Sequence, residues 1–160
     1  MATIRYLEAM FGLGPEQEHI AVPAKAGVKL KEMVDDLLGT DDMIAIYIPE
    51  GTDDVYQNEG QRGRVVGAVK LLQMPANRTV DNYFFNDLLT RERRWPIGWP
   101  CQVVYFPPNN AGPLLRNLVD LIHGPGNFQP FVGGLQHGPK KLDLKMAKRL
   151  LEELSPFPVR

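Results

Sequence analysis

The sequence predicts an α+β fold in which helices flank a small, curved and mostly antiparallel β-sheet or barrel. Short segments rich in β-branched residues recur along the chain, and segments with a helical spacing of apolar residues are inserted between them at irregular intervals. This irregular order disfavours a doubly wound parallel sheet, in which strands and helices alternate. A chain of 160 residues is long enough for one domain with a hydrophobic core, so we expect a single domain over residues 1–160.

Several segments have the composition of β-strands. Polar and apolar residues alternate, with interruptions, over residues 3–10, which indicates an opening strand. Residues 41–50 form a compact apolar run that Pro49 ends. Residues 64–72 form a similar run, in which Gly67 indicates a bulge or a close backbone approach. These two runs are expected to pair as a hairpin with a long loop. The remaining candidates are residues 19–24, as a strand or an extended connection, and residues 101–106.

Three segments have apolar residues at helical spacing. They are residues 28–39 and 112–124, which both end in glycine, and residues 142–154 near the end of the chain. By contrast, the density of glycine and proline over residues 126–139 predicts extended loop structure.

The charged residues are divided unevenly along a chain whose net charge is −1. Residues 1–60 contain twelve Asp and Glu against four Lys and Arg, whereas residues 61–160 contain seven against fourteen. This polarity permits a basic face that binds phosphate. Alternatively, the two halves pair with each other across the fold. Five basic residues near the last helix are typical of a solvated face, with a nucleic-acid groove as the alternative: Lys140, Lys141, Lys145, Lys148 and Arg149.

Several classes of function have no support in the sequence. No run approaches the roughly 18 apolar residues of a membrane span, and the first residues lack the features of a secretory signal, so we expect a cytoplasmic protein that does not enter a membrane. Cys101 is the single cysteine, and three scattered histidines lack the spacing of metal ligands. Phosphate-binding glycine loops and nucleophile elbows are also absent. We therefore expect no metal, no cofactor and no catalysis.

Residues 93–100, RRWPIGWP, combine arginine, tryptophan and proline in eight positions. Arginine pairs bidentately with phosphate oxygens, and indole rings stack on bases for about 1–3 kcal/mol each. The two prolines stiffen the segment, which would hold the tryptophans in place before a ligand arrives. Trp95 and Trp99 are therefore candidates for a base pocket, although either indole alone is also typical of core packing. The candidate phosphate contacts are Arg62, Arg64, Arg93 and Arg94.

The segments DDMIAIYIPE, GRVVGAVKLLQMP and RRWPIGWPCQVVYF follow one another, with a polar and aromatic insert before the last. In this order, over residues 40–107, they resemble the central portion of EVE domains. These domains belong to the PUA-like superfamily, which also contains YTH and ASCH domains. The resemblance implies a PUA-like β-barrel with flanking helices that performs no catalysis and accommodates a modified or flipped base in an aromatic pocket. By position, the resemblance adds Tyr47, Pro49 and Gly67 to the candidate pocket.

The leading hypothesis is therefore a non-enzymatic module that binds nucleic acid and reads a modified or flipped base, with DNA that contains methylated or hydroxymethylated bases as the first candidate. Two alternatives stay open. One is a protein-interaction module in which the tryptophan segment contacts a partner chain. The other is an enzyme that acts on nucleic acid or nucleotides through a carboxylate such as Asp53 or Asp54.

Overall fold

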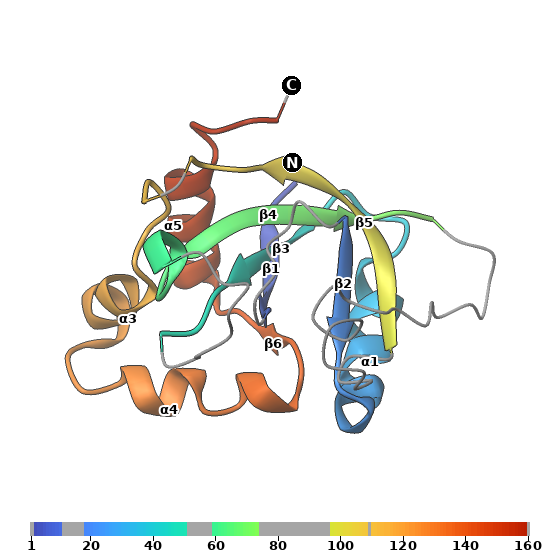
Figure 1. Cartoon of the computed structure of the whole chain (residues 1–160), viewed down its shortest axis with the longest axis horizontal. Coiled ribbons are helices and arrows are strands. Elements are labelled where there is room, and N and C mark those ends of the chain that lie inside the picture. The colour runs from blue at the N-terminus through green and yellow to red at the C-terminus, as the bar shows by residue number, and fades with distance from the viewer. Residues whose placement is uncertain (1, 11–17, 51–58, 74–96, 109, 160) are drawn as a thin grey trace.

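The computed structural model describes residues 2–10, 18–50, 59–73, 97–108 and 110–159. Within them, helices and strands follow one another as shown in Figure 1. The strands are β1 (Ile4–Ala9), β2 (His19–Val22), β3 (Met43–Tyr47), β4 (Val65–Leu71), β5 (Ile97–Tyr105) and β6 (Lys140–Lys141). The helices are α1 (Gly27–Leu37), α3 (Leu115–His123), α4 (Phe128–Val132) and α5 (Leu144–Leu154), with short 3₁₀ turns η2 (Ala24–Ala26), η3 (Glu59–Gln61) and η4 (Leu135–His137).

The six strands form one curled sheet in the order β2-β5-β4-β3-β1-β6. The curl gives the sheet the shape of a half-barrel, with helices on both of its faces (Figure 1). β1 and β3 run parallel, and the chain passes through β2 and α1 between them. The other neighbouring strands are antiparallel, so the sheet is mixed. The α+β class is therefore confirmed.

The predicted hairpin is present as β3 and β4. Ile46 is in register with Gly67, whereas the next residue of β3, Tyr47, is in register with Val65. Val66 is thus the extra residue of a β-bulge, as the glycine in this strand indicated.

Two hydrophobic clusters lie on opposite faces of the sheet. One contains Ile20 from β2, Trp99 from β5, Ile46 from β3 and Tyr6 from β1, and α1 packs against them. Because this cluster joins β2 at one end of the sheet to β1 near the other, it lies inside the curl, and we call this side the inner face. The second cluster contains Leu7 and other residues that α3, α4 and α5 cover, and we call this side the outer face.

The local sequence explains how the two long helices form. In α1, one stripe of apolar side chains is buried against the inner face, and Gly39 adopts a φ of +87° just after the helix, where a Cβ would be unfavourable. In α5, Asp143 is the N-cap, because its side chain accepts a hydrogen bond from the backbone N–H of Met146.

The prediction of extended loop structure over residues 126–139 is wrong, because α4 and η4 lie there. Pro130 is tolerated since it lies in the first turn of α4, where its missing N–H has no intrahelical partner to lose. Phe128, Phe131 and Leu135 recur at helical spacing and are buried against the outer face. Their burial therefore outweighs the local preference of glycine and proline for loops.

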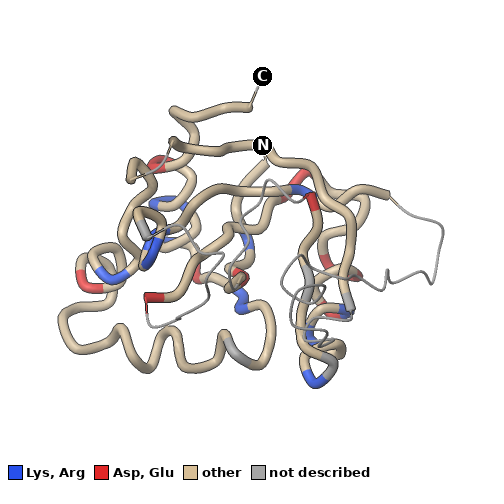
Figure 2. Tube along the Cα trace, in the orientation of Figure 1, with Lys and Arg blue, Asp and Glu red and all other residues tan. Residues whose placement is uncertain are grey.

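Acidic and basic positions are interspersed along the described chain (Figure 2). Some ion pairs join the acidic and basic halves of the sequence, such as Arg116 with Glu50 at 3.0 Å and Lys141 with Asp36 at 4.0 Å. At these positions, a basic residue of the second half of the sequence pairs with an acidic residue of the first half. In the described part of the chain, no helix combines the length and the apolar character needed to cross a bilayer.

Candidate functional site

The structure separates two of the aromatic residues predicted to form the pocket. Trp99 is 4% exposed on the inner face, and its indole N–H donates a 2.8 Å hydrogen bond to the carbonyl oxygen of Leu72. Tyr47 is 3% exposed on the outer face, where burial raises the pKa of its hydroxyl to about 12. Because the sheet lies between these side chains, they do not line a common pocket in this arrangement.

The other predicted pocket residues have different positions. Gly67 is buried on β4 in register with Ile46, so it lies on the inner face with Trp99. Pro49 is half-buried just beyond the end of β3. Trp95, together with the predicted phosphate contacts Arg93 and Arg94, lies outside the described residues.

Arg64, one of the predicted phosphate contacts, donates hydrogen bonds to two backbone carbonyl oxygens. Its Nε donates to the carbonyl oxygen of Gly60 at 3.1 Å, and its Nη1 donates to that of Gly112 at 2.6 Å. The guanidinium thus connects η3 with the segment that precedes α3 through hydrogen bonds. Arg62 is half-buried, and its Nε is buried without a hydrogen-bond partner.

Two adjoining grooves lie beside the edge strand β6. The Tyr6 groove has a volume of about 430 Å³, and the His123 groove one of about 350 Å³. Pro130, Lys140 and Lys141 line both grooves, so the two form one continuous surface. The Tyr6 groove is completed by Tyr6, Lys29, Glu32, Gly134 and Pro139, and the His123 groove by His123, Asn127, Phe131 and Asp143.

Strand pairing explains why residues so distant in sequence line one groove. β6 pairs with β1, which places Lys141 opposite Tyr6. Gly138, just before β6, has a φ of +126°, and a Cβ there would lie 2.8 Å from the Cβ of Lys29. Glycine thus allows the chain to approach α1 closely, which brings Lys29 to the same groove.

Lys140 is fixed between the two grooves. Its ammonium donates a 2.8 Å hydrogen bond to the carbonyl oxygen of Phe131 and lies 3.9 Å from the centroid of the Phe131 ring. Burial lowers the pKa of Lys140. Because an ammonium has three donors, the contact with Phe131 leaves Lys140 able to bind an anion in a fixed position.

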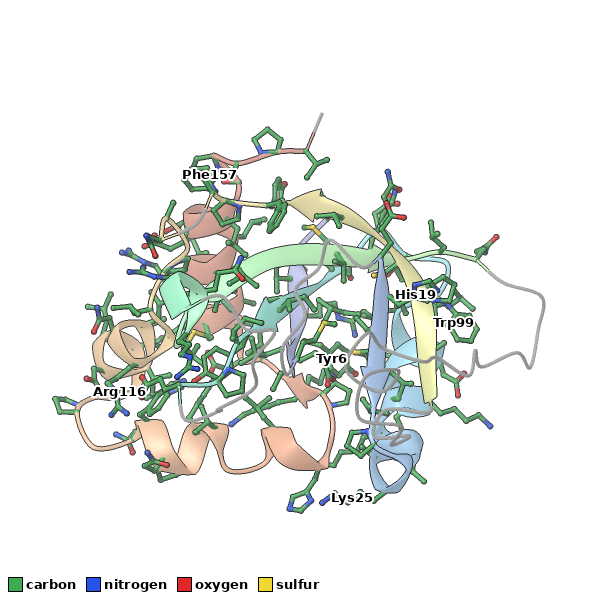
Figure 3. All side chains as sticks on the ribbon, viewed as in Figure 1. Tyr6, His19, Lys25, Trp99, Arg116 and Phe157 are labelled. Carbon is green, nitrogen blue, oxygen red and sulfur yellow. The ribbon has the colours of Figure 1, made fainter. Side chains whose placement is uncertain are left out.

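Tyr6 forms the wall of its groove through a polar network. Its hydroxyl donates to Asp36 at 2.8 Å, and Arg5 donates to the same carboxylate oxygen at 2.6 Å. These hydrogen bonds lower the pKa of Asp36, while burial and the bond to Asp36 raise the pKa of Tyr6 to about 12. In Figure 3, Tyr6 lies in the middle of the molecule, whereas Arg116 and Trp99 lie towards opposite sides.

A second polar pair lies in the His123 groove. His123 Nε2 is 2.9 Å from the carboxylate of Asp143, and the imidazole ring is tilted against Phe131 with centroids 5.7 Å apart. Asp143 is also the N-cap of α5. The residue that caps α5 therefore also holds the imidazole of His123 in place.

Glu8 is the residue on the inner face that the sequence did not point to. It is 2% exposed, and its Oε2 has no hydrogen-bond partner. Burial raises the pKa of Glu8 well above its ordinary value. The sequence did contain a signal for this residue. In a strand over residues 3–10, alternation puts Tyr6, Glu8 and Met10 on the same face, so the carboxyl of Glu8 shares a face with two large apolar side chains.

Neither the known protein families nor the curated proteins contain a match to this chain. Among the described residues, no three side chains of His, Cys, Asp or Glu are grouped so that they could hold a metal ion. Burial raises the pKa of Cys101 to about 12, which keeps this thiol protonated.

Proposed function

We propose that this domain is a non-enzymatic nucleic-acid-binding module with a PUA-like fold, which holds a modified or flipped base on its inner face. The observation that supports this function best is the pair of grooves joined at Lys140 and Lys141. Three lysines and one glutamate line the Tyr6 groove, so its charge favours an anion. Modified DNA is the first candidate ligand.

The position of the grooves relative to the sheet supports the same function. Lys141 has a side chain that is 66% exposed and only a long contact of 4.0 Å with Asp36, so a phosphate could displace this contact, whereas Tyr6 extends from the groove to the inner face. A strand whose phosphates follow the lysines would therefore pass close to the opening of the curled sheet. Extruding a base costs a few kcal/mol, which contacts on the inner face would offset.

The proposal of a PUA-like fold rests on the strands of residues 40–107, the region that resembles EVE domains, and on their order in the sheet. β3, β4 and β5, which the resemblance to EVE domains covers, are neighbours in the sheet. Gly67 lies buried on the inner face, where the absence of a side chain would let an inserted base approach the backbone closely once this face opens.

Fluorescence anisotropy of labelled oligonucleotides tests this function. Single- and double-stranded DNA and RNA, with and without methylated or hydroxymethylated cytosine and methylated adenine, would be titrated between 50 and 200 mM salt. We expect binding that weakens with salt and favours one modified base. Absence of binding to every oligonucleotide at low salt would contradict the proposal and favour the protein-interaction alternative.

Matched lysine variants locate the contact. Lys141→Ala is expected to weaken binding and to reduce the slope of log K against log salt by about 0.7 for a single strand, the value for one phosphate contact. Lys145→Ala is the control, because Lys145 is exposed on α5 and does not line either groove. Equal effects of the two substitutions would show that binding occurs elsewhere.

A further inference from the structure

The carboxyl of Glu8 occupies a defined position on the inner face. Its neighbours Leu7 and Ala9 belong to the outer cluster, whereas Tyr6 and Met10 belong to the inner cluster, so alternation directs Glu8 inward. Glu8 is in register with Ile46, which is in register with Gly67. The three residues thus form a row across β1, β3 and β4, about 10 Å from end to end.

One oxygen of the Glu8 carboxyl, Oε2, has no hydrogen-bond partner among the described residues. Ile46 is fully buried beside Glu8, and apolar side chains of α1 cover the inner face. Burial alone accounts for the raised pKa of Glu8. Because a buried polar group without a partner destabilises the fold, an apolar residue here would serve stability better.

We propose that Glu8 recognises the edge of an inserted base, with its carboxyl donating one hydrogen bond and accepting another. This assignment rests on the proposed nucleic-acid function and names the residue that selects the base. Tyr6 is two positions away on the same face of β1 and lines the Tyr6 groove, so the site proposed at Glu8 lies two residues along β1 from a groove residue. The inner face must open for the base to enter, since Glu8 is almost fully buried.

The chemistry of a neutral acid defines the class of base. Its O–H donates and its carbonyl oxygen accepts, side by side. Adenine and cytosine present one complement, an exocyclic amine next to a ring nitrogen that accepts, and thymine and uracil present another, a ring N–H next to a carbonyl oxygen. Guanine has a second adjacent N–H, which would remain without an acceptor and cost binding free energy on an apolar face. A methyl or hydroxymethyl group on C5 of cytosine lies off this edge, so such a modification is compatible with the pairing.

Two substitutions test the role of Glu8. Glu8→Gln keeps a donor beside an acceptor in the same shape, whereas Glu8→Met keeps the shape and removes both. Binding would be measured with single-stranded oligonucleotides that differ only in one central base. We expect wild type and Glu8→Gln to favour adenine or cytosine over guanine, and Glu8→Met to lose about tenfold or more in affinity together with that preference.

The outcomes separate this assignment from the proposed function. If wild type binds and Glu8→Met keeps both its affinity and its preference, the assignment to Glu8 is overturned while nucleic-acid binding stands. If Glu8→Gln loses binding as completely as Glu8→Met, the neutral donor and acceptor pair is overturned. If wild type binds no oligonucleotide at low salt, the proposed function fails and this assignment with it. Glu152→Gln, at an exposed position of α5, is the matched control, and circular dichroism checks that each variant is folded.

Discussion

Two carboxyls near β1 have opposite protonation preferences because their surroundings differ. Asp36 accepts hydrogen bonds from Tyr6 and Arg5, and these bonds lower its pKa. Glu8 is buried, its Oε2 has no hydrogen-bond partner, and burial raises its pKa. The ionised form of the first carboxyl is therefore favoured and orders the wall of the groove, whereas burial favours the neutral form of the second on the inner face.

Glu8 makes the stability of the domain depend on pH. Its pKa is raised in the folded state, so above its ordinary value of 4.5 the folded chain binds more protons than the unfolded chain. Stability therefore falls as the pH rises through this range, by at most about 1.4 kcal/mol per pH unit. Urea unfolding of wild type and Glu8→Gln between pH 5 and 8 measures this effect. The stability difference in favour of Glu8→Gln should grow with pH, whereas an identical pH dependence of the two proteins would contradict a neutral Glu8.

The limits of sequence-based prediction are clear at the level of elements. The hairpin of β3 and β4 and the helices α1, α3 and α5 follow from local periodicity and end signals, which the sequence displays directly. α4 was missed because proline and glycine were given more weight than the spacing of buried phenylalanines. The two-residue strand β6 has no local signal, since only its pairing with β1 makes it a strand.

α5 provides a test of how one side chain connects two elements. Asp143 caps α5 through one carboxylate oxygen and lies 2.9 Å from His123 of α3 through the other. We expect Asp143→Ala to lower the free energy of unfolding by about 1 kcal/mol, because the first turn loses its cap. Asn is as good an N-cap as Asp. Asp143→Asn should therefore lower the free energy of unfolding only by the contribution of the exposed pair with His123, a few tenths of a kcal/mol. Chemical denaturation compares the variants, and equal losses would show that the cap contributes little.

At the scale of the whole molecule, the candidate site is a product of tertiary structure. Tyr6, Lys29 and Lys141 line one groove because β6 pairs with β1 and the chain before β6 approaches α1. Likewise, the position of Glu8 beside Ile46 depends on the parallel pairing of β1 with β3, across a connection that contains β2 and α1. Sequence periodicity contains no information on such pairings. The candidate site was therefore sought by composition, which directed attention to the tryptophan segment instead of β6 and Glu8.

The two clusters share β1, β3 and β4, and this arrangement predicts that the inner and outer faces unfold together. Loss of these strands would expose both faces at once, which favours a single cooperative transition. The chain has two tryptophans, so Trp95→Phe leaves Trp99 as a fluorescent probe of the inner cluster. Far-ultraviolet circular dichroism reports on the helices, most of which cover the outer face. In urea, the two signals should give the same midpoint within error. A midpoint for Trp99 fluorescence clearly below that of the helical signal would mean that the inner face opens separately, which would provide a route for a base to reach Glu8.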